Sequence, residues 1–333
     1  MTPPPLARGK PYNVEMESIT ANVVTADQVG IARAGEILRA GGLVAFPTET
    51  VYGLGADATK DRAVAAIFAA KDRPRFNPLI VHVRDLPQAE THAEFNLAAR
   101  ALAERFWPGP LSLVLPRKQT SPLSLLVSAG LETVALRVPS NSIAQKMLAA
   151  AGRPIAAPSA NLSGQVSATT AAHVAADFGE RVDLVLDGGA TRLGLESTVI
   201  GFDGERPVLL RPGAVPREEI ERVAGPLTES ASGRISSPGQ LASHYAPRTP
   251  LRLNAKEVGW DEALLAFGPP LAGGKIVRNL SASGDLMEAA ANFFAGLREL
   301  DAAGTRMIAA MPVPEHGLGE AINDRLRRAA ERP

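Results

Sequence analysis

The sequence predicts an α/β protein with a large domain, in which helices flank a twisted mixed sheet, and a smaller carboxyl-terminal α/β domain. Short apolar runs bounded by Pro and Gly alternate with alanine-rich helical stretches along most of the chain. Between about residues 224 and 250 this rhythm gives way to small polar residues and prolines. The 333 residues also exceed the roughly 100–200 that one hydrophobic core usually serves.

The large domain is expected to span residues 1–225. Apolar runs of strand length predict strands at 43–46, 79–83, 111–115, 134–138, 182–186, 198–202 and 208–210. Helical patterns between them predict helices at 63–71, 95–106, 143–151, 168–178 and 216–223. This order favours one mixed sheet with helices packed on it.

A linker over 226–250 and a small domain over 251–333 complete the prediction. Strands are expected at 251–253, 263–267, 275–277 and 306–310, and helices at about 285–300 and 319–330. In the first of these helices Leu286, Ala290, Phe293, Leu297 and Leu300 recur every three or four residues, which predicts one buried stripe. Strands alternating with helices over this length indicate a small Rossmann-like domain.

Composition excludes several classes of protein. With 45% apolar and 21% charged residues the chain is neither disordered nor fibrous, and no run approaches the ~18 apolar residues that span a bilayer. Prolines and charges in residues 1–13 disfavour a signal peptide, so we expect a cytoplasmic protein without a membrane partner. The 35 basic and 35 acidic residues balance, which disfavours stable nucleic-acid binding. With no cysteine and five scattered histidines, no metal-ligating residues are predicted.

A first polar motif, PTETVYGLG at residues 47–55, follows the predicted strand 43–46. Hydroxyls and a carboxylate at the carboxyl end of a strand face the crevice where α/β sheets bind ligands. Capping of a following helix explains the same residues equally well. Gly53 and Gly55 imitate a dinucleotide fingerprint, but residues 48–52 separate them from the strand, so this interpretation is disfavoured.

A second motif places Lys71, Arg73 and Arg75 in a loop stiffened by two prolines. Such a loop is suited to holding phosphate oxygens, because arginine offers a planar fork and lysine a point charge. The alternative is that Lys71 complements a helix end and the arginines are solvated. His82 follows in the strand 79–83 on the same side as Ile80, where a lone histidine is more often a core residue than a ligand.

Polar residues recur at other predicted strand ends. Ser159 and Asn161 lie in PSANLSG, which either binds phosphate or caps the next helix. Ser197 opens one strand, Arg211 follows another, and Arg137 sits in an apolar strand where its charge needs a partner. Their shared placement indicates a ligand site at the sheet.

Taken in order, these motifs resemble the YrdC-type threonylcarbamoyl-AMP synthase family. The resemblance rests on PTETVYGLG, KDRPRFNPLIVHV, FWPGPLSLVL, ALRVPS, PIAAPSANLSG, ESTV and LLRPGA, over about residues 30–225. The segment 237–247 resembles the connector of the two-domain form, which carries a Rossmann-like carboxyl-terminal domain. The resemblance implies a YrdC-like fold for the large domain.

The resemblance also implies an activity. The family makes threonylcarbamoyl-adenylate from L-threonine, bicarbonate or CO₂, and ATP, with Mg²⁺, and releases pyrophosphate. Other proteins transfer the threonylcarbamoyl group to the tRNA adenosine next to the anticodon, and these are the partners that the resemblance implies.

By motif position, the resemblance implies roles for thirteen residues. Lys71 and Arg73 would be catalytic, and Thr50, His82, Arg137 and Ser197 would contact threonine. The ATP site would be formed by Arg73, Asn77, Thr133, Ser159, Asn161, Ser167, Arg211 and Tyr245. Residues 240–243 and Ala157 depart from the pattern of many relatives, which reduces the polar contacts expected from the linker and from one loop.

Two other functions fit parts of the sequence. An RNA-binding module without ATP turnover is the main alternative, although zero net charge and 5% aromatic residues disfavour it. A carbamoyl-transfer enzyme of hydrogenase maturation shares the domain, but it usually adds zinc-finger segments, and this chain has no cysteine.

Overall fold

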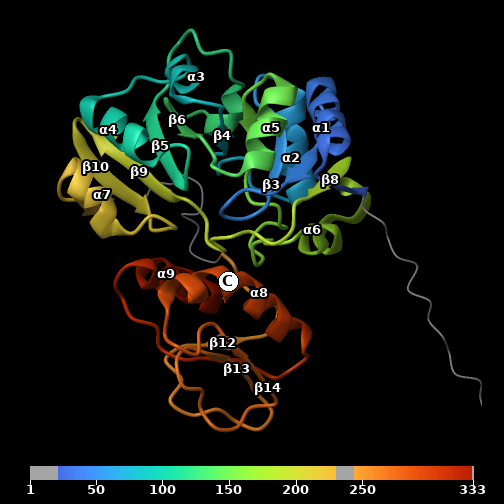
Figure 1. Ribbon diagram of the computed structural model, residues 1–333, viewed down its shortest axis with the longest axis vertical. Coiled ribbons are helices and arrows are strands. Elements are labelled where there is room, and N and C mark those ends of the chain that lie inside the picture. Colours follow the sequence, from blue (N-terminus) through green and yellow to red (C-terminus); the bar gives the residue numbers. More distant parts are fainter. Residues whose placement is uncertain (1–21, 230–243, 332–333) are drawn as a thin grey trace, which may run out of the picture.

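The computed structural model describes residues 22–229 and 244–331, which form two domains with one sheet each (Figure 1). The large sheet has the spatial order β1-β8-β2-β3-β7-β4-β6-β5-β9-β10-β11. Its strands are β1 (Val23–Thr25), β2 (Val44–Phe46), β3 (Gly53–Asp57), β4 (Ile80–His82), β5 (Leu111–Pro116), β6 (Thr133–Arg137), β7 (Ile155–Ala156), β8 (Leu184–Asp187), β9 (Thr198–Asp203), β10 (Arg206–Arg211) and β11 (Thr228–Glu229). Parallel pairs such as β4 with β6 alternate with antiparallel pairs such as β5 with β6, so the predicted mixed sheet is confirmed.

Helices cover both faces of this sheet. They are α1 (Gln28–Ala40), α2 (Asp61–Lys71), α3 (Leu86–Glu90), α4 (Leu97–Phe106), α5 (Ser142–Ala151), α6 (Ala171–Phe178) and α7 (Arg217–Ala224). On one face α1 and α5 pack on β2 and β8, with Leu38, Phe46 and Met147 in a shared core. On the other face α2, α4, α6 and α7 share a larger core with residues of several strands, such as Ala45 of β2 and Leu113 of β5.

The side of β4, β6, β5 and β9 that faces away from α2 and α4 positions the functional site. Leu79, Val81 and Leu136 point into the large core, whereas Ile80 and Ala135 belong to a small apolar cluster on the opposite face. Because side chains alternate along a strand, His82 and Arg137 also lie on that opposite face. The alternation expected for His82 and Ile80 is therefore observed.

Six strands and helices of the large domain were not predicted from sequence: β1, α1, β3, α3, β7 and β11. Gly53 and Gly55 lie in β3, antiparallel to β2, and not in a strand-to-helix turn. A Cβ on Gly55 would lie 2.8 Å from Cε1 of Phe46, so glycine is needed for the close approach of the ring. The strand β11 falls inside the range expected for the linker, yet it pairs with β10 of the large sheet.

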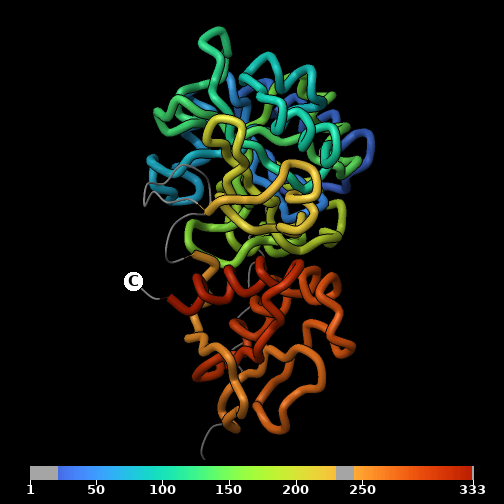
Figure 2. Tube along the Cα trace, turned by 90° about the vertical axis from the view of Figure 1, so that its left-hand side faces the viewer, coloured from blue at the N-terminus to red at the C-terminus, as the bar shows by residue number. Residues whose placement is uncertain are grey.

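The small domain has a four-stranded parallel sheet in the order β12-β15-β13-β14. Its elements are β12 (Leu251–Arg252), β13 (Ala263–Ala266), β14 (Ile276–Asn279), α8 (Leu286–Ala302), β15 (Ile308–Ala310) and α9 (Leu318–Ala330). The predicted stripe of α8 is buried at Ala290, Phe293, Leu297 and Leu300. Both helices lie on the side of the sheet that faces the large domain (Figures 1 and 2).

The two domains meet at α8 and α9 through charges and close backbone contact. Arg298 of α8 lies 2.6 Å from the carboxylate of Asp177, and Arg217 of α7 lies 2.7 Å from that of Glu320 on α9. Gly194 of the large domain has a φ of 68°, and a Cβ there would lie 2.4 Å from the carbonyl oxygen of Ala290. Within the described residues, every helix is too short or too polar to cross a membrane.

Gly194→Ala should loosen the joint between the domains, because the new methyl group would meet the backbone of α8. Gly204→Ala is the matched control: its φ is 60°, and no atom lies within 4 Å of the added Cβ. Both variants carry the strain of a left-handed alanine, about 1 kcal/mol. We expect the melting temperature to fall further in Gly194→Ala than in Gly204→Ala. X-ray scattering should show a radius of gyration above that of the wild type in Gly194→Ala but not in Gly204→Ala. Equal behaviour of the two variants would contradict the assigned contact.

Candidate active site

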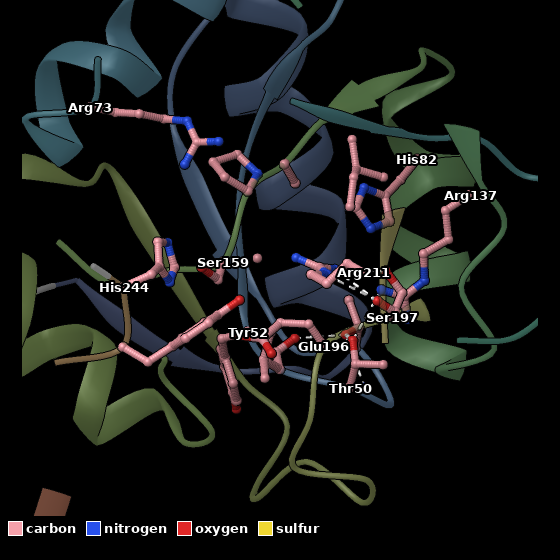
Figure 3. Close-up of a pocket in the computed structure, with 17 residues that line it drawn as sticks. Thr50, Tyr52, Arg73, His82, Arg137, Ser159, Glu196, Ser197, Arg211 and His244 are labelled. Carbon is pink, nitrogen blue, oxygen red and sulfur yellow. Dashed lines mark hydrogen bonds between the residues drawn. The ribbon is translucent and has the colours of Figure 1, made fainter. Parts of the chain in front are cut away.

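A pocket opens on the face of the large sheet described above (Figure 3). Strand residues, two loops and the chain that enters the small domain form its wall. Its lining residues are Thr48, Thr50, Val51, Tyr52, Gly53, Arg73, Ile80, His82, Arg137, Ala157, Pro158, Ser159, Glu196, Ser197, Arg211, His244 and Tyr245.

Two loops are joined by backbone hydrogen bonds at the base of the pocket. The N–H of Ala160 donates to the carbonyl of Tyr52 at 2.7 Å, and the N–H of Leu54 donates to that of Pro158 at 2.9 Å. The PTET motif and the PSAN motif are therefore held against each other. This arrangement places their hydroxyl groups, Thr50 and Ser159, in one cavity.

At one end of the pocket Arg137 is paired with a buried carboxylate. Its Nη2 donates to Oε1 of Glu49 at 2.6 Å, and its Nη1 donates to the hydroxyl of Thr50 at 3.0 Å. The other Glu49 oxygen accepts the N–H of Ser140 at 3.1 Å and that of Asn141 at 3.3 Å, just before α5. Burial alone would raise the pKa of Glu49, but the charge and hydrogen bond of Arg137 hold it below its usual value.

Two further arginines bring positive charge that is not neutralised by a bonded carboxylate. Arg73 donates to the carbonyls of Asn77 at 3.2 Å and Pro78 at 2.9 Å, and Arg211 donates to the carbonyl of Ser197 at 2.8 Å. Neither forms a salt bridge with an acidic residue in the described parts of the chain. Burial lowers the pKa of Arg73 to about 10, so it stays charged at neutral pH. This end of the pocket is suited to an anion such as phosphate.

Several polar atoms that face the pocket have no hydrogen-bond partner among the described residues. They are Nδ1 of His82, Nδ1 of His244 and the hydroxyl of Tyr245. Buried polar atoms are almost always paired, so these atoms are candidates for ligand contacts. Burial, helped by the charge of Arg137, lowers the pKa of His82 to about 3, which leaves the imidazole neutral at pH 7.

Tyr245 is held in place from the small domain and from the large one. Its ring lies 5.6 Å from that of Phe294 on α8, and its φ is 63°. The next residue, Ala246, donates its N–H to the carbonyl of Gly164 at 2.8 Å. The residues 240–243, whose departure from the family pattern was noted, lie outside the described residues.

The pocket brings together eight of the thirteen residues expected from sequence: Thr50, Arg73, His82, Arg137, Ser159, Ser197, Arg211 and Tyr245. In Figure 3 Arg73 and His244 lie at one end, His82 and Arg137 at the other, and Arg211 and Ser197 between them. The groups that the resemblance assigns to threonine and to the nucleotide thus lie toward opposite ends of the cavity and meet in its middle, where Arg211 donates to Ser197.

The other five residues lie behind or beyond the pocket wall. Lys71 is 1% exposed and donates to the carbonyls of Ser159, at 2.6 Å, and Asn161. Asn161 in turn accepts the Ser159 hydroxyl at 2.6 Å, and Ser167 donates to Glu196 at 2.6 Å. Asn77 is fully buried next to Arg73, and its amide has no partner among the described residues. Thr133 lies on the same face of β6 as Arg137, at the far end of the strand.

Sequence reasoning missed Glu49, Glu196 and His244 as parts of the site. Glu49 could have been found, since a buried Arg137 needs a carboxylate and Glu49 lies next to Thr50 in the first motif. Glu196 and His244 each adjoin a predicted site residue, but no pattern in the sequence shows which way their side chains point.

Comparison with models of protein families shows which family this chain matches. The model Sua5_yciO_yrdC, described as "Telomere recombination", matches residues 36–213, and the model of the threonylcarbamoyl-AMP synthase C-terminal domain matches residues 215–331. The chain belongs to the Sua5/YciO/YrdC family. The resemblance drawn from the motifs is therefore confirmed.

Individual relatives agree with the two-domain arrangement. The threonylcarbamoyl-AMP synthase of Pyrococcus abyssi is 44% identical over 89% of this chain and 93% of its own length. A crystal structure of P. abyssi Sua5 complexed with L-threonine superposes with a TM-score of 0.86 and 41% identity, over 93% of this chain and 96% of that one. A putative threonylcarbamoyl-AMP synthase of Mycobacterium tuberculosis is 39% identical over 59% of this chain and 89% of its own length, so it is too short to contain both domains.

Arg137→Met should destabilise the large domain by about 3–5 kcal/mol, because it leaves the Glu49 carboxylate buried without its cation. Arg137→Met/Glu49→Gln should recover most of this loss. The free energy of unfolding of each variant can be measured by urea denaturation monitored through tryptophan fluorescence. Trp107 reports on the large domain, where its indole N–H donates to the carbonyl of Leu111 at 2.7 Å.

The pH dependence of these variants has a defined sign. In the wild type the pKa of Glu49 is lowered, so its stabilising contribution is present above its unfolded value and is lost as the pH falls below it. In Arg137→Met, burial without the cation raises this pKa, so the penalty should shrink between about pH 8 and about pH 5 as the carboxyl takes up a proton. A penalty that is constant over this range would contradict the assigned pairing.

Proposed function

We propose that this protein is a threonylcarbamoyl-AMP synthase. The observation that carries the proposal is the pocket itself, in which three arginines, four serine or threonine side chains and the neutral His82 converge from distant segments. A relative that bears this name is 44% identical to this chain over 89% of its length, and a second is 41% identical over 90%. The proposed reaction joins L-threonine, bicarbonate or CO₂, and ATP into threonylcarbamoyl-adenylate, and it releases pyrophosphate.

Threonine is proposed to bind at the end formed by Thr50, His82, Arg137 and Ser197. The guanidinium of Arg137, fixed by Glu49, has N–H groups left over from its bonds to Gly109, Thr50 and Glu49, and these can donate to the carboxylate of an amino acid. The neutral imidazole of His82, whose Nδ1 is unpartnered, is suited to accept a hydrogen bond from the amino group. A relative of this chain has been crystallised with L-threonine, which agrees with this assignment.

ATP is proposed to occupy the other end and to extend along the open face of the sheet. Arg73 and Ser159 line the cavity there, Arg211 lines its middle, and Asn77, Thr133, Asn161 and Ser167 lie beside or beyond them. The arginines would neutralise charge on the phosphates, and Tyr245 would close over the nucleotide. Lys71 would act indirectly, because its ammonium holds the loop that carries Ser159 and Asn161.

The chemistry requires no covalent enzyme intermediate. The threonine amine attacks CO₂ and loses a proton to give a carbamate, and a carbamate oxygen then attacks the α-phosphorus of ATP, from which pyrophosphate leaves. The protein has to place three reactants in one cavity and stabilise charge that develops on phosphate. A carbamate loses CO₂ readily, so a pocket whose wall residues are mostly buried is an advantage.

Mg²⁺ is proposed to arrive with the triphosphate. Among the described residues no group of three or more histidines or carboxylates could hold a metal ion. Mg²⁺ commonly keeps few protein ligands and binds the phosphates of a nucleotide, and the hydroxyl-lined pocket fits this mode.

The proposed setting follows from the product. A threonylcarbamoyl-adenylate is an activated acyl donor, so proteins that transfer the group to tRNA are the proposed partners. ATP and tRNA are both cytoplasmic, so we place the reaction there. The RNA-binding alternative gains no support from the structure, since the converging charges line a pocket and are not spread over a surface.

Arg73→Met should lower kcat/KM for ATP by ~30-fold or more, because a charged contact to phosphate is worth about 2–3 kcal/mol. The matched control is Arg75→Met, in the same loop, whose side chain is exposed and does not line the pocket. Threonine-dependent pyrophosphate release measures both. If the two variants have equal activity, Arg73 has no part in the reaction.

Amino-acid selectivity tests the other end of the pocket. Pyrophosphate release should be fastest with L-threonine, lower with serine by roughly 10–200-fold, and lowest with valine. The reason is that hydroxyl groups lining this end would lose a hydrogen-bond partner with valine, whereas serine lacks only a methyl group. Turnover with valine equal to that with threonine would rule out the proposed threonine site.

A further inference from the structure

Arg325 lies on α9 of the small domain, yet its side chain ends in the wall of the pocket. It is 0% exposed. Its Nε donates to Oε2 of Glu196 at 3.1 Å, and its Nη1 donates to the carbonyl of Pro212 at 2.6 Å. Its guanidinium carbon is 5.3 Å from the centre of the Tyr245 ring.

Each of these contacts touches a different part of the pocket wall. Glu196 and Tyr245 line the cavity, and Pro212 follows Arg211, which lines it too. The second oxygen of Glu196 accepts the hydroxyl of Ser167, so the carboxylate is held from both sides. One guanidinium therefore ties together Glu196, the turn after β10 and Tyr245.

The contacts of Arg325 are all at the nucleotide end or the middle of the pocket. No contact joins it to Thr50, His82 or Arg137 in the described part of the chain. Its other partner is the neighbouring carboxylate of Asp324, at 2.8 Å. A change at Arg325 should therefore act directly on Glu196, Tyr245 and the turn after β10, and much less on Thr50, His82 and Arg137.

We propose that Arg325 is a positioning residue for the nucleotide end of the pocket, through which docking of the small domain orders Glu196, Arg211 and Tyr245. This inference rests on the proposed function. It gives the small domain a task in the reaction, because Arg325 of α9 supports residues of the pocket wall from behind. The relative from M. tuberculosis, which is too short for both domains, cannot supply such a group from a second domain.

The test compares Arg325→Met with Glu320→Gln. Glu320 is on the same helix and pairs with Arg217 across the same domain joint, but it does not line this pocket. For Arg325→Met we expect kcat/KM for ATP to fall by at least about 30-fold, with KM for threonine within about twofold of wild type. Glu320→Gln should be close to wild type on both, and Arg325→Lys should recover part of the loss, since it keeps the charge.

Calorimetry separates this inference from the proposed function. The affinity for MgATP, measured without turnover, should fall in Arg325→Met and stay unchanged in Glu320→Gln, while the affinity for L-threonine alone stays unchanged in both. A wild-type protein that binds both ligands but releases no pyrophosphate would refute the proposed function only. Equal nucleotide affinity for Arg325→Met and Glu320→Gln, or equal losses for both ligands in Arg325→Met, would refute the role of Arg325.

A double variant keeps the test valid if Arg325→Met does not fold. Arg325→Met leaves the Glu196 carboxylate without its cation, whereas Arg325→Met/Glu196→Gln removes both charges and should fold. The double variant should show the same selective loss of nucleotide affinity as expected for the single one. If Arg325→Met folds, its defect and that of Glu196→Gln should be non-additive, because both break one contact. Additive defects, or a double variant with wild-type nucleotide affinity, would overturn the proposal.

Discussion

Positive charge that is buried has to be held by oxygen atoms, and the pocket of this protein depends on that constraint. Removing a guanidinium or an ammonium from water is costly unless its donors find acceptors. Here the acceptors are mostly backbone carbonyls: those of Ser159 and Asn161 for Lys71, of Asn77 and Pro78 for Arg73, and of Ser197 for Arg211. The bonds of Lys71 fix the PSAN loop against α2, which is far away in sequence, whereas those of Arg73 close the short loop before β4 and that of Arg211 joins β10 to the residue before β9.

The same bonds determine the charge of the pocket. A carbonyl holds a cation in place without cancelling its charge, whereas a carboxylate does both. Arg137 is paired with Glu49, so that end is nearly neutral, while Arg73 and Arg211 retain their charge for a ligand. The asymmetry fits a zwitterionic amino acid at one end and a polyphosphate at the other, which is the pair of substrates proposed for this protein.

Much of the fold and of the site could be predicted from the sequence. Alternating apolar strands such as β4 and β6 are visible as short runs, and polar motifs at their ends mark a shared edge. The order of several motifs also identified the family. β3 was missed because its glycines, which make room for Phe46, resemble a loop in sequence. The role proposed for Arg325 could not be predicted from the sequence, because a single arginine in an amphipathic helix is usually solvated. Only the tertiary structure shows that its side chain is buried.

The carboxyl-terminal side of Tyr245 carries its anchors: the bond from Ala246 to Gly164 and the helix α8 against which the ring packs. The place of the ring is therefore set by residues that follow it and by the large domain, and not by the number of residues that precede it. The entropic cost of closing a loop rises slowly with its length, by only about 0.6 kcal/mol for each doubling of the number of residues. Evolution can thus lengthen or shorten the chain ahead of this tyrosine among homologues and still keep the same aromatic cover over the cavity.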